Sequence, residues 1–215
     1  MDYEGISIER LNHDGFKIKG SKTIYIDPYQ IGESEKADLI LITHEHFDHC
    51  SVQDIAKVAD ANTIIVTVAD CQSKLSGLNV RHVTLVEPGN KINVEGLNVE
   101  VVPAYNTNKF SSPGVPFHPK EQGWIGFILT IDGKRIYHAG DTDNIPEMSN
   151  LENIDVALLP VSGTYVMTAM EAVEACRKIN PKLAIPMHYG SIVGSQSDAE
   201  SFKQRASGIC RVEII

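Results

Sequence analysis

The chain has 215 residues, 42% of them hydrophobic and 22% charged, which is the composition of an ordinary globular domain with one sizeable core. Its 19 Lys and Arg against 28 Asp and Glu give a formal charge of −9, which disfavours nonspecific binding to nucleic acid. No run reaches the ~18 consecutive apolar residues of a membrane span, and the N-terminal segment lacks the pattern of a signal peptide, so we expect a cytoplasmic protein without a membrane partner.

The first half of the chain is predicted to be rich in strands. Short apolar or alternating runs punctuated by Gly, Asn and Asp predict strands at 6–11, 15–20 and 22–27. Residues 37–43 form a continuous apolar run, typical of a strand buried on both faces. Residues 51–59 have helical spacing with Ser51 as N-cap, and 62–70 return to strand. This order predicts a strand–loop–helix–strand unit.

The second half continues with strands and then alternates strands with helices. Turns at "EPGN" and "EGLN" divide the strands of 82–105, and Asp132-Gly133 predicts a hairpin turn. Residues 106–123 are the one long irregular stretch. The last third predicts a strand at 155–161, a helix at 168–180 with a Thr168/Glu171 capping box, a strand at 183–190 and a helix from about Ser197. We therefore expect one α/β domain, residues 1–215, with two sheets and helices outside them.

The segment "LITHEHFDHC", residues 41–50, places three histidines and two acids after a buried strand. The helical zinc motif HExxH is absent, because Asp48 stands where its second histidine would be. In extended backbone His44 and His46 point to one side and can bind one cation, whereas Asp48 and His49 suit a second, adjacent cation. Titratable groups at a strand end are costly unless paired, so we favour metal binding over a solvated polar loop.

Two further ligand candidates also follow apolar runs. Asp141 follows "RIYHAG" and could bridge two cations through its two oxygens, while His188 follows "LAIPM" and could complete the second site. Imidazole and carboxylate donors suit two divalent ions, Zn²⁺ or Mn²⁺, with iron as a further candidate.

With these motifs the chain resembles the metallo-β-lactamase superfamily of metal-dependent hydrolases. The matching segments are "THEHFDH" for its HxHxDH signature, "IYHAGDT" for its bridging aspartate, "YIDPY" for an early aspartate and "PMHYG" for its late histidine. Within the superfamily, "LNHDGF" and "PVSGTYVMTAMEA" resemble the branch of small hydrolases that includes L-ascorbate-6-phosphate lactonase.

The resemblance implies an α/β fold, a four-layer αββα sandwich of two mixed sheets flanked by helices, with a dinuclear metal site. It implies that the first metal is held by His44 and His46, that Asp141 bridges, and that Asp27 orients a ligand histidine. The second metal is then held by Asp48, His49 and His188.

The chain departs from the family at one ligand. The family's third histidine for the first metal is expected at the position of Asn106. Either His118, at the far end of the same loop, replaces it, or the first site is completed by water and substrate. We favour His118.

Four other residues are candidates to orient ligands or to contact substrate. His13 either lines the pocket or caps a turn, and His138 precedes the bridging aspartate, where it suits support of a ligand better than ligation. Tyr165 and Tyr189 border the inferred site and either contact substrate or pack.

We predict a hydrolase in which metal-activated hydroxide attacks an ester, lactone or phosphoester bond of a small molecule, with Asp48 orienting the nucleophile. One alternative is a nuclease or phosphodiesterase of the same fold, which the acidic charge disfavours. The other is a metal-binding protein with little catalysis, which Asn106 keeps open. The oligomeric state is left open, with a homo-oligomer as one option.

Overall fold

The computed structural model describes residues 1–32 and 35–215 of the chain. These residues form two compact units, Met1–Glu87 (unit 1) and Pro88–Ile215 (unit 2). Each has its own sheet, and the grouping of both into a single domain stays a prediction. Among the described residues, none of the helices has the length and apolar character that crossing a membrane requires.

Unit 1 is built on a seven-stranded mixed sheet whose strands follow sequence order. Strands β1 to β4 pair antiparallel and β4 to β7 pair parallel. The strands are β1 Asp2–Tyr3, β2 Ile6–Asn12, β3 Gly15–Lys19, β4 Thr23–Ile26, β5 Leu39–Leu41, β6 Ile64–Thr67 and β7 His82–Leu85. The central strands β4 and β5 are buried throughout, and for β5 this burial is the one that the apolar run 37–43 predicts.

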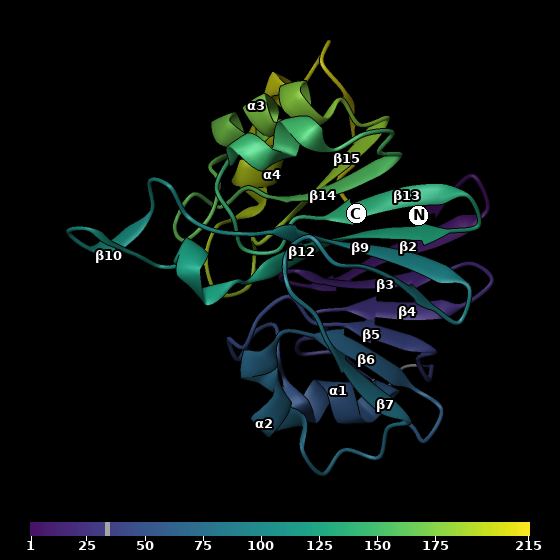
Figure 1. Ribbon diagram of the computed structural model, residues 1–215. Coiled ribbons are helices and arrows are strands. Elements are labelled where there is room, and N and C mark those ends of the chain that lie inside the picture. The colour runs from purple at the N-terminus through teal and green to yellow at the C-terminus, as the bar shows by residue number, and fades with distance from the viewer. Residues whose placement is uncertain (33–34) are drawn as a thin grey trace. The chain divides into compact units, whose positions relative to one another are not determined.

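The helices of unit 1 follow β5 and β6. Helix α1 (Val52–Val58) begins at Ser51, whose side chain accepts a hydrogen bond from the Asp54 amide, so the predicted N-cap is confirmed. A 3₁₀ turn, η1 (Ala69–Cys71), leads into α2 (Gln72–Leu75), which the sequence pattern did not predict. Both α helices lie beside β6 and β7 in Figure 1.

Unit 2 contains a second seven-stranded mixed sheet, in the order β16-β15-β14-β13-β12-β9-β8. Strands β8, β9, β12 and β13 pair antiparallel, and β13 to β16 pair parallel. The strands are β8 Lys91–Val94, β9 Leu97–Pro103, β12 Ile125–Ile131, β13 Lys134–His138, β14 Val156–Pro160, β15 Leu183–Met187 and β16 Arg211–Val212. Asp132 and Gly133 have φ of 47° and 76° between β12 and β13, so the predicted hairpin turn is confirmed.

Helices α3 (Ala169–Ile179) and α4 (Gln196–Arg205) pack on the parallel strands of this sheet and on each other. The predicted capping box of α3 is present, with Thr168 and Glu171 bonding each other's backbone amides. Two 3₁₀ turns, η2 (Lys120–Gln122) and η3 (Pro146–Asn150), complete the unit.

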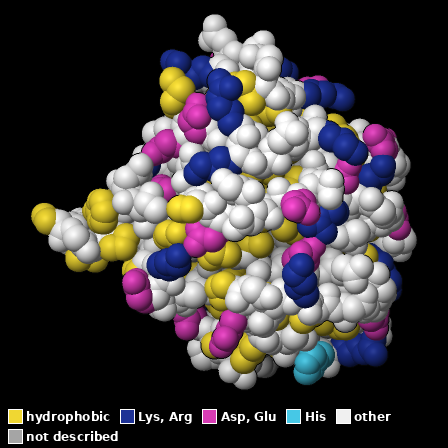
Figure 2. All heavy atoms as spheres, turned by 45° about the horizontal axis from the view of Figure 1, so that its top comes forward, with side chains coloured by type: hydrophobic (Ala, Val, Ile, Leu, Met, Phe, Trp, Pro, Cys, Tyr) yellow, Lys and Arg dark blue, Asp and Glu magenta, His cyan; other side chains and the backbone are white. Residues whose placement is uncertain are grey.

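The segment expected to be wholly irregular contains a short hairpin, β10 (Phe110–Ser112) and β11 (Val115–Pro116). Gly114 supplies the positive φ of 77° that its turn requires. The hairpin projects from unit 2 in Figure 1, and its end carries hydrophobic side chains in Figure 2; Phe110 and Val115 are about half exposed. The expectation of an irregular 106–123 is thus corrected, while the α/β class with two mixed sheets is confirmed.

Candidate metal centre

In unit 1, the loop between β5 and α1 turns sharply and gathers its histidines. The amides of His49 and Cys50 both donate to the carbonyl of His46, which folds the loop back on itself. As a result His44 Nε2 lies 2.9 Å from His46 Nδ1, and the rings of His44 and His49 have centroids 4.0 Å apart. His44 and His49 are buried and His46 is partly exposed.

Asp27 anchors this loop from the end of β4. Its carboxylate accepts hydrogen bonds from the Thr43 amide (2.8 Å), the Thr43 hydroxyl (2.6 Å) and His49 Nδ1 (2.7 Å). Because the hydroxyl gives its one proton to Asp27, it accepts from His44 Nδ1 at 3.0 Å. Both imidazoles therefore carry a proton on Nδ1 and can present Nε2 to a cation, which is how carboxylates orient metal-binding histidines.

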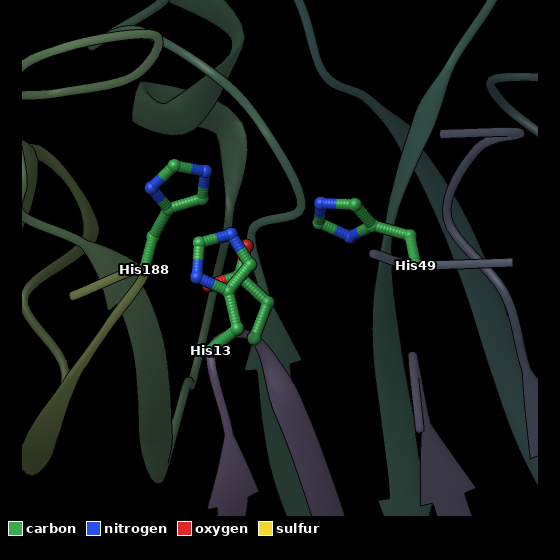
Figure 3. Close-up of side chains that lie close together, drawn as sticks. His13, His49 and His188 are labelled. Carbon is green, nitrogen blue, oxygen red and sulfur yellow. The ribbon is translucent and has the colours of Figure 1, made fainter. Parts of the chain in front are cut away.

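His13 meets the same loop from the turn between β2 and β3. Its Nε2 lies 3.3 Å from Asp48 Oδ2, and its ring is edge-on to that of His49 at 6.0 Å (Figure 3). His49 Nε2 lies 3.8 Å from the same Asp48 oxygen. Unit 1 thus brings together all of its sequence-predicted candidates, His44, His46, Asp48, His49, Asp27 and His13.

In unit 2, two imidazoles face one carboxylate. Asp141 Oδ2 lies 3.1 Å from His118 Nε2 and 3.3 Å from His188 Nε2, and all three side chains are buried. Two donors held at about 2.0–2.1 Å by one tetrahedral ion are about 3.3 Å apart, so these separations suit shared coordination. The three residues follow β11, β13 and β15 in the chain and are 70 positions apart at their extremes.

Asn106 lies behind His118 and controls its orientation. Asn106 Oδ1 accepts from both the amide (2.8 Å) and Nδ1 (2.9 Å) of His118, while Asn106 Nδ2 donates to the Tyr165 carbonyl at 2.9 Å. The bond to Tyr165 determines which amide atom is the oxygen. His118 Nδ1 therefore carries the proton, and Nε2 is the atom that faces Asp141.

His188 is supported in the same manner by a hydroxyl. Ser162 Oγ lies 2.9 Å from His188 Nδ1, and His188 itself has φ of 58°, in the left-handed region. Such a conformation is uncommon for a residue other than glycine and is costly, and it occurs here directly after β15. The Tyr165 ring is edge-on to His188 at 6.5 Å, which places this tyrosine beside the candidate ligand.

The remaining sequence candidates lie nearby in the chain and are buried. His138, the last residue of β13, accepts a hydrogen bond on Nδ1 from the Gly140 amide at 3.2 Å and so supports the turn that carries Asp141. Tyr189 follows His188 and is 3% exposed.

Sequence reasoning missed several participants. Asp14 is fully buried and groups with His13 and His49; its sequence context, "NHDG", is that of an ordinary turn. Asp143 is also buried, and its Oδ2 accepts from the amides of Thr107 (2.6 Å) and Asn108 (2.8 Å), which ties the segment after Asn106 to the segment after Asp141. Thr43 and Ser162 were missed because hydroxyls have no distinctive spacing.

Cys50, next to His49, pairs with another thiol. Cys50 and Cys71 are both buried and hydrogen-bonded to each other, an interaction that lowers the pKa of Cys50 and raises the pKa of Cys71. The Cys50 thiol is therefore part of the core of unit 1.

A groove of about 520 Å³ on unit 2 lies elsewhere. It is floored by Val101, Ile128 and Tyr137 and rimmed by the ion-paired Glu100 and Arg135. None of the candidate ligands lines it. The site is accordingly identified by its donor chemistry and not by the size of a cavity.

The donors fit divalent ions. Four candidate histidines whose Nδ1 has a defined partner turn their Nε2 toward another donor: His44, His49, His118 and His188. Imidazoles and carboxylates without thiolates suit Zn²⁺, Mn²⁺ or Fe²⁺ at a catalytic site better than a structural zinc.

Comparison with known proteins is consistent with this chemistry. The model of the Beta-lactamase superfamily domain matches residues 7–188. The chain is 32% identical to a UPF0173 metal-dependent hydrolase from Pelotomaculum thermopropionicum, covering 95% of this chain and 93% of that one. It is 33% identical to one from Thermococcus onnurineus, covering 98% and 96%.

Solved structures show the same fold. One match is the crystal structure of a protein from Parabacteroides distasonis that is named as a metal-dependent hydrolase. Its TM-score is 0.80, and it is 32% identical over 97% of this chain and 92% of that one. Igni18, a metallo hydrolase from Ignicoccus hospitalis, matches with a TM-score of 0.78 over 98% and 94%; at 24% identity it supports the fold alone.

Proposed function

The chain belongs to the beta-lactamase superfamily, and we propose that this metal-dependent hydrolase holds two divalent cations and cleaves an ester, lactone or phosphoester bond of a small molecule. A substrate of this size suits the strongly negative chain, which would repel nucleic acid. The lactonase-like branch and a cytoplasmic location belong to the same proposal.

We assign the donors by the order of their motifs in the sequence and by family membership. The first cation would be held by His44, His46 and His118, with Asp141 shared between both ions. The second would be held by Asp48, His49 and His188. Zn²⁺ and Mn²⁺ are the candidates, with Fe²⁺ third.

One observation carries the proposal most directly. In unit 2, the Nε2 atoms of His118 and His188 approach one oxygen of Asp141 at 3.1 and 3.3 Å, and the Nδ1 atoms are held by Asn106 and Ser162. Two separate supports thus present two donor atoms to the same carboxylate oxygen. This arrangement suits a carboxylate that coordinates ions together with both imidazoles.

When bound, the ions would lower the pKa of a water molecule from about 15.7 toward neutrality, which supplies hydroxide at pH 7. Asp48 would orient that nucleophile; its support is His13, whose Nε2 lies 3.3 Å from Asp48 Oδ2 and restrains the carboxylate. Asp27, directly for His49 and through Thr43 for His44, places a ring proton on Nδ1, so that Nε2 of each ring would face the ion.

The test uses the full chain freed of metal with a chelator and reloaded with Zn²⁺ or Mn²⁺. We expect two ions per chain by elemental analysis, and metal-dependent turnover on a panel of lactones, phosphomonoesters and phosphodiesters. His46→Ala should lose at least about 100-fold of the activity, whereas His82→Ala, an exposed strand residue of the same unit, should not.

Other outcomes separate the alternatives. Metal-independent turnover that survives His46→Ala defeats the proposal. One bound ion with no turnover supports a metal-binding protein, and cleavage of RNA or DNA fragments alone supports a nuclease.

A further inference from the structure

The turn between β2 and β3 carries two buried titratable side chains. His13 and Asp14 are both 0% exposed, although hairpin turns usually face water. The turn is constrained: His13 has φ of 50°, its amide donates to Asn12 Oδ1 at 3.0 Å, and a Cβ added at Gly15 would lie 3.0 Å from the carbonyls of Asn12 and Asp27. Because no side chain fits at Gly15, the turn lies close against the backbone of Asp27 with His13 and Asp14 buried.

The side chains of this turn are aimed at His49. His13, Asp14 and His49 each offer one ligand atom, and these atoms lie within 4.8 Å of one another. Figure 3 shows the His13 and His49 rings projecting into the same space. Donor atoms that share one ion at about 2.1 Å are separated by up to about 4.2 Å, so small side-chain rotations suffice for common coordination. The bond from His49 Nδ1 to Asp27 leaves His49 Nε2 as the donor.

The side-chain types of this cluster also suit a cation. Asp14, Asp27 and Asp48 surround His13 and His49, through the contacts already described. Carboxylates and imidazoles are the donor types that divalent ions bind in proteins.

We propose that His13 and Asp14 are metal-binding residues that join His49 on the second cation, an inference that rests on the proposed function. With Asp48, unit 1 then supplies four protein donors to that ion.

The main test is a titration of the chelator-treated full chain with Mn²⁺, followed by calorimetry and by the electron paramagnetic resonance signal of free Mn²⁺. Asp14→Asn keeps the size of the side chain and removes its charge. We expect it to weaken one of the two ions at least 10-fold and to leave the other unchanged. The matched control is Asp132→Asn, an exposed acid in the β12–β13 hairpin turn, which should bind both ions like wild type.

Comparison with His44→Ala separates this inference from the proposed function. If His44→Ala loses an ion while folded Asp14→Asn keeps both at wild-type affinity, the proposed function stands and this inference is wrong. If wild type binds no ion, both are wrong.

A second measurement needs no variant of the turn. In wild-type protein labelled with ¹⁵N-histidine, added Zn²⁺ should shift the ring nitrogen signals of His13 together with those of His49. An unchanged His13 signal at full Zn²⁺ loading overturns its assignment as a ligand, even if Asp14→Asn fails to fold.

Discussion

The two units position their candidate metal donors in different ways. Each has a seven-stranded mixed sheet in which antiparallel pairs precede parallel pairs, and each presents imidazoles beyond the strand ends. Unit 1 concentrates its candidate donors in the loop 44–49 and the turn 13–14. Unit 2 takes His118, Asp141 and His188 from three separate connections.

The residues that hold the candidate histidines by hydrogen bonds also differ between the two units. In unit 1 a single carboxylate, Asp27, holds the Thr43 backbone and hydroxyl and the His49 ring. In unit 2 each histidine has its own support, Asn106 for His118 and Ser162 for His188. Loss of Asp27 should therefore disturb all the candidate donors of the 44–49 loop together. Loss of Asn106 or Ser162 should disturb only the one histidine that each supports.

The largest effect is expected for Asp27→Ala. Three donors in a fully buried region lose their acceptor, which should cost about 3 kcal/mol of unfolding free energy. Activity and metal content should both fall sharply, by about 100-fold for activity. Chemical denaturation and elemental analysis measure these losses.

Asp38→Ala is the control, because Asp38 also accepts a backbone bond in unit 1, from Thr23 at 2.8 Å, but contacts no candidate ligand. Wild-type metal content in Asp27→Ala would contradict the idea of a shared support.

A smaller effect is expected for Asn106→Ala, because it frees His118 alone. We expect roughly 10-fold weaker binding of one ion, with the other unchanged, as is typical when the support of a metal ligand is removed. Asn106→Asp keeps an acceptor for both His118 bonds but replaces the donor to the Tyr165 carbonyl with an acceptor, so its affinity should lie between that of Asn106→Ala and wild type. Calorimetric titration with Zn²⁺ tests this, with Asn108→Ala as control; equal binding by Asn106→Ala contradicts it.

Ser162→Ala should have a weaker effect still. It removes one neutral hydrogen bond to His188 Nδ1, and a water molecule can replace a hydroxyl at this half-buried position. We expect less than a 10-fold loss in metal affinity and no change in fold. Ser111→Ala, on the exposed β10–β11 hairpin, serves as its control. If Ser162→Ala lost as much bound metal as Asp27→Ala, the expected difference between the two units would be contradicted.

The smallest effect concerns the scaffold of unit 2. Burial by itself raises the pKa of Glu171. The hydrogen bonds from Lys109 and the Thr168 amide lower it by more, and the resulting pKa is about 2. Since this pKa lies below the ordinary 4.5, the stabilisation is present above about pH 4.5 and is lost as pH falls toward 2.

Glu171→Gln should therefore cost about 1 kcal/mol at pH 7, a value discounted for the partial exposure of the carboxylate, and less at pH 3. Denaturant unfolding at both pH values measures this. The metal content should not change, and a loss of metal would show that the donors of unit 2 depend on the α3 cap.

Local patterns in the sequence were sufficient for much of the fold and for the unit 1 loop. Ser51, the Asp132-Gly133 turn and the Thr168/Glu171 box were all predictable, because a cap or a tight turn depends on residues within three or four positions. The six positions from His44 to His49 could be interpreted for the same reason, since one strand end carries all of them.

The sequence alone could not predict the hydrogen bonds between Asn106 and His118 or the burial of Asp14; both became known only from the folded structure. Asn106 and His118 are twelve positions apart in the chain, and the β10–β11 hairpin between them has a sequence that suggests only a loop. Asp14 lies in what reads as a solvent-exposed turn and becomes a candidate ligand only because the turn is buried beside His49. Burial and side-chain proximity depend on how the whole unit packs, and no short window of sequence contains that information.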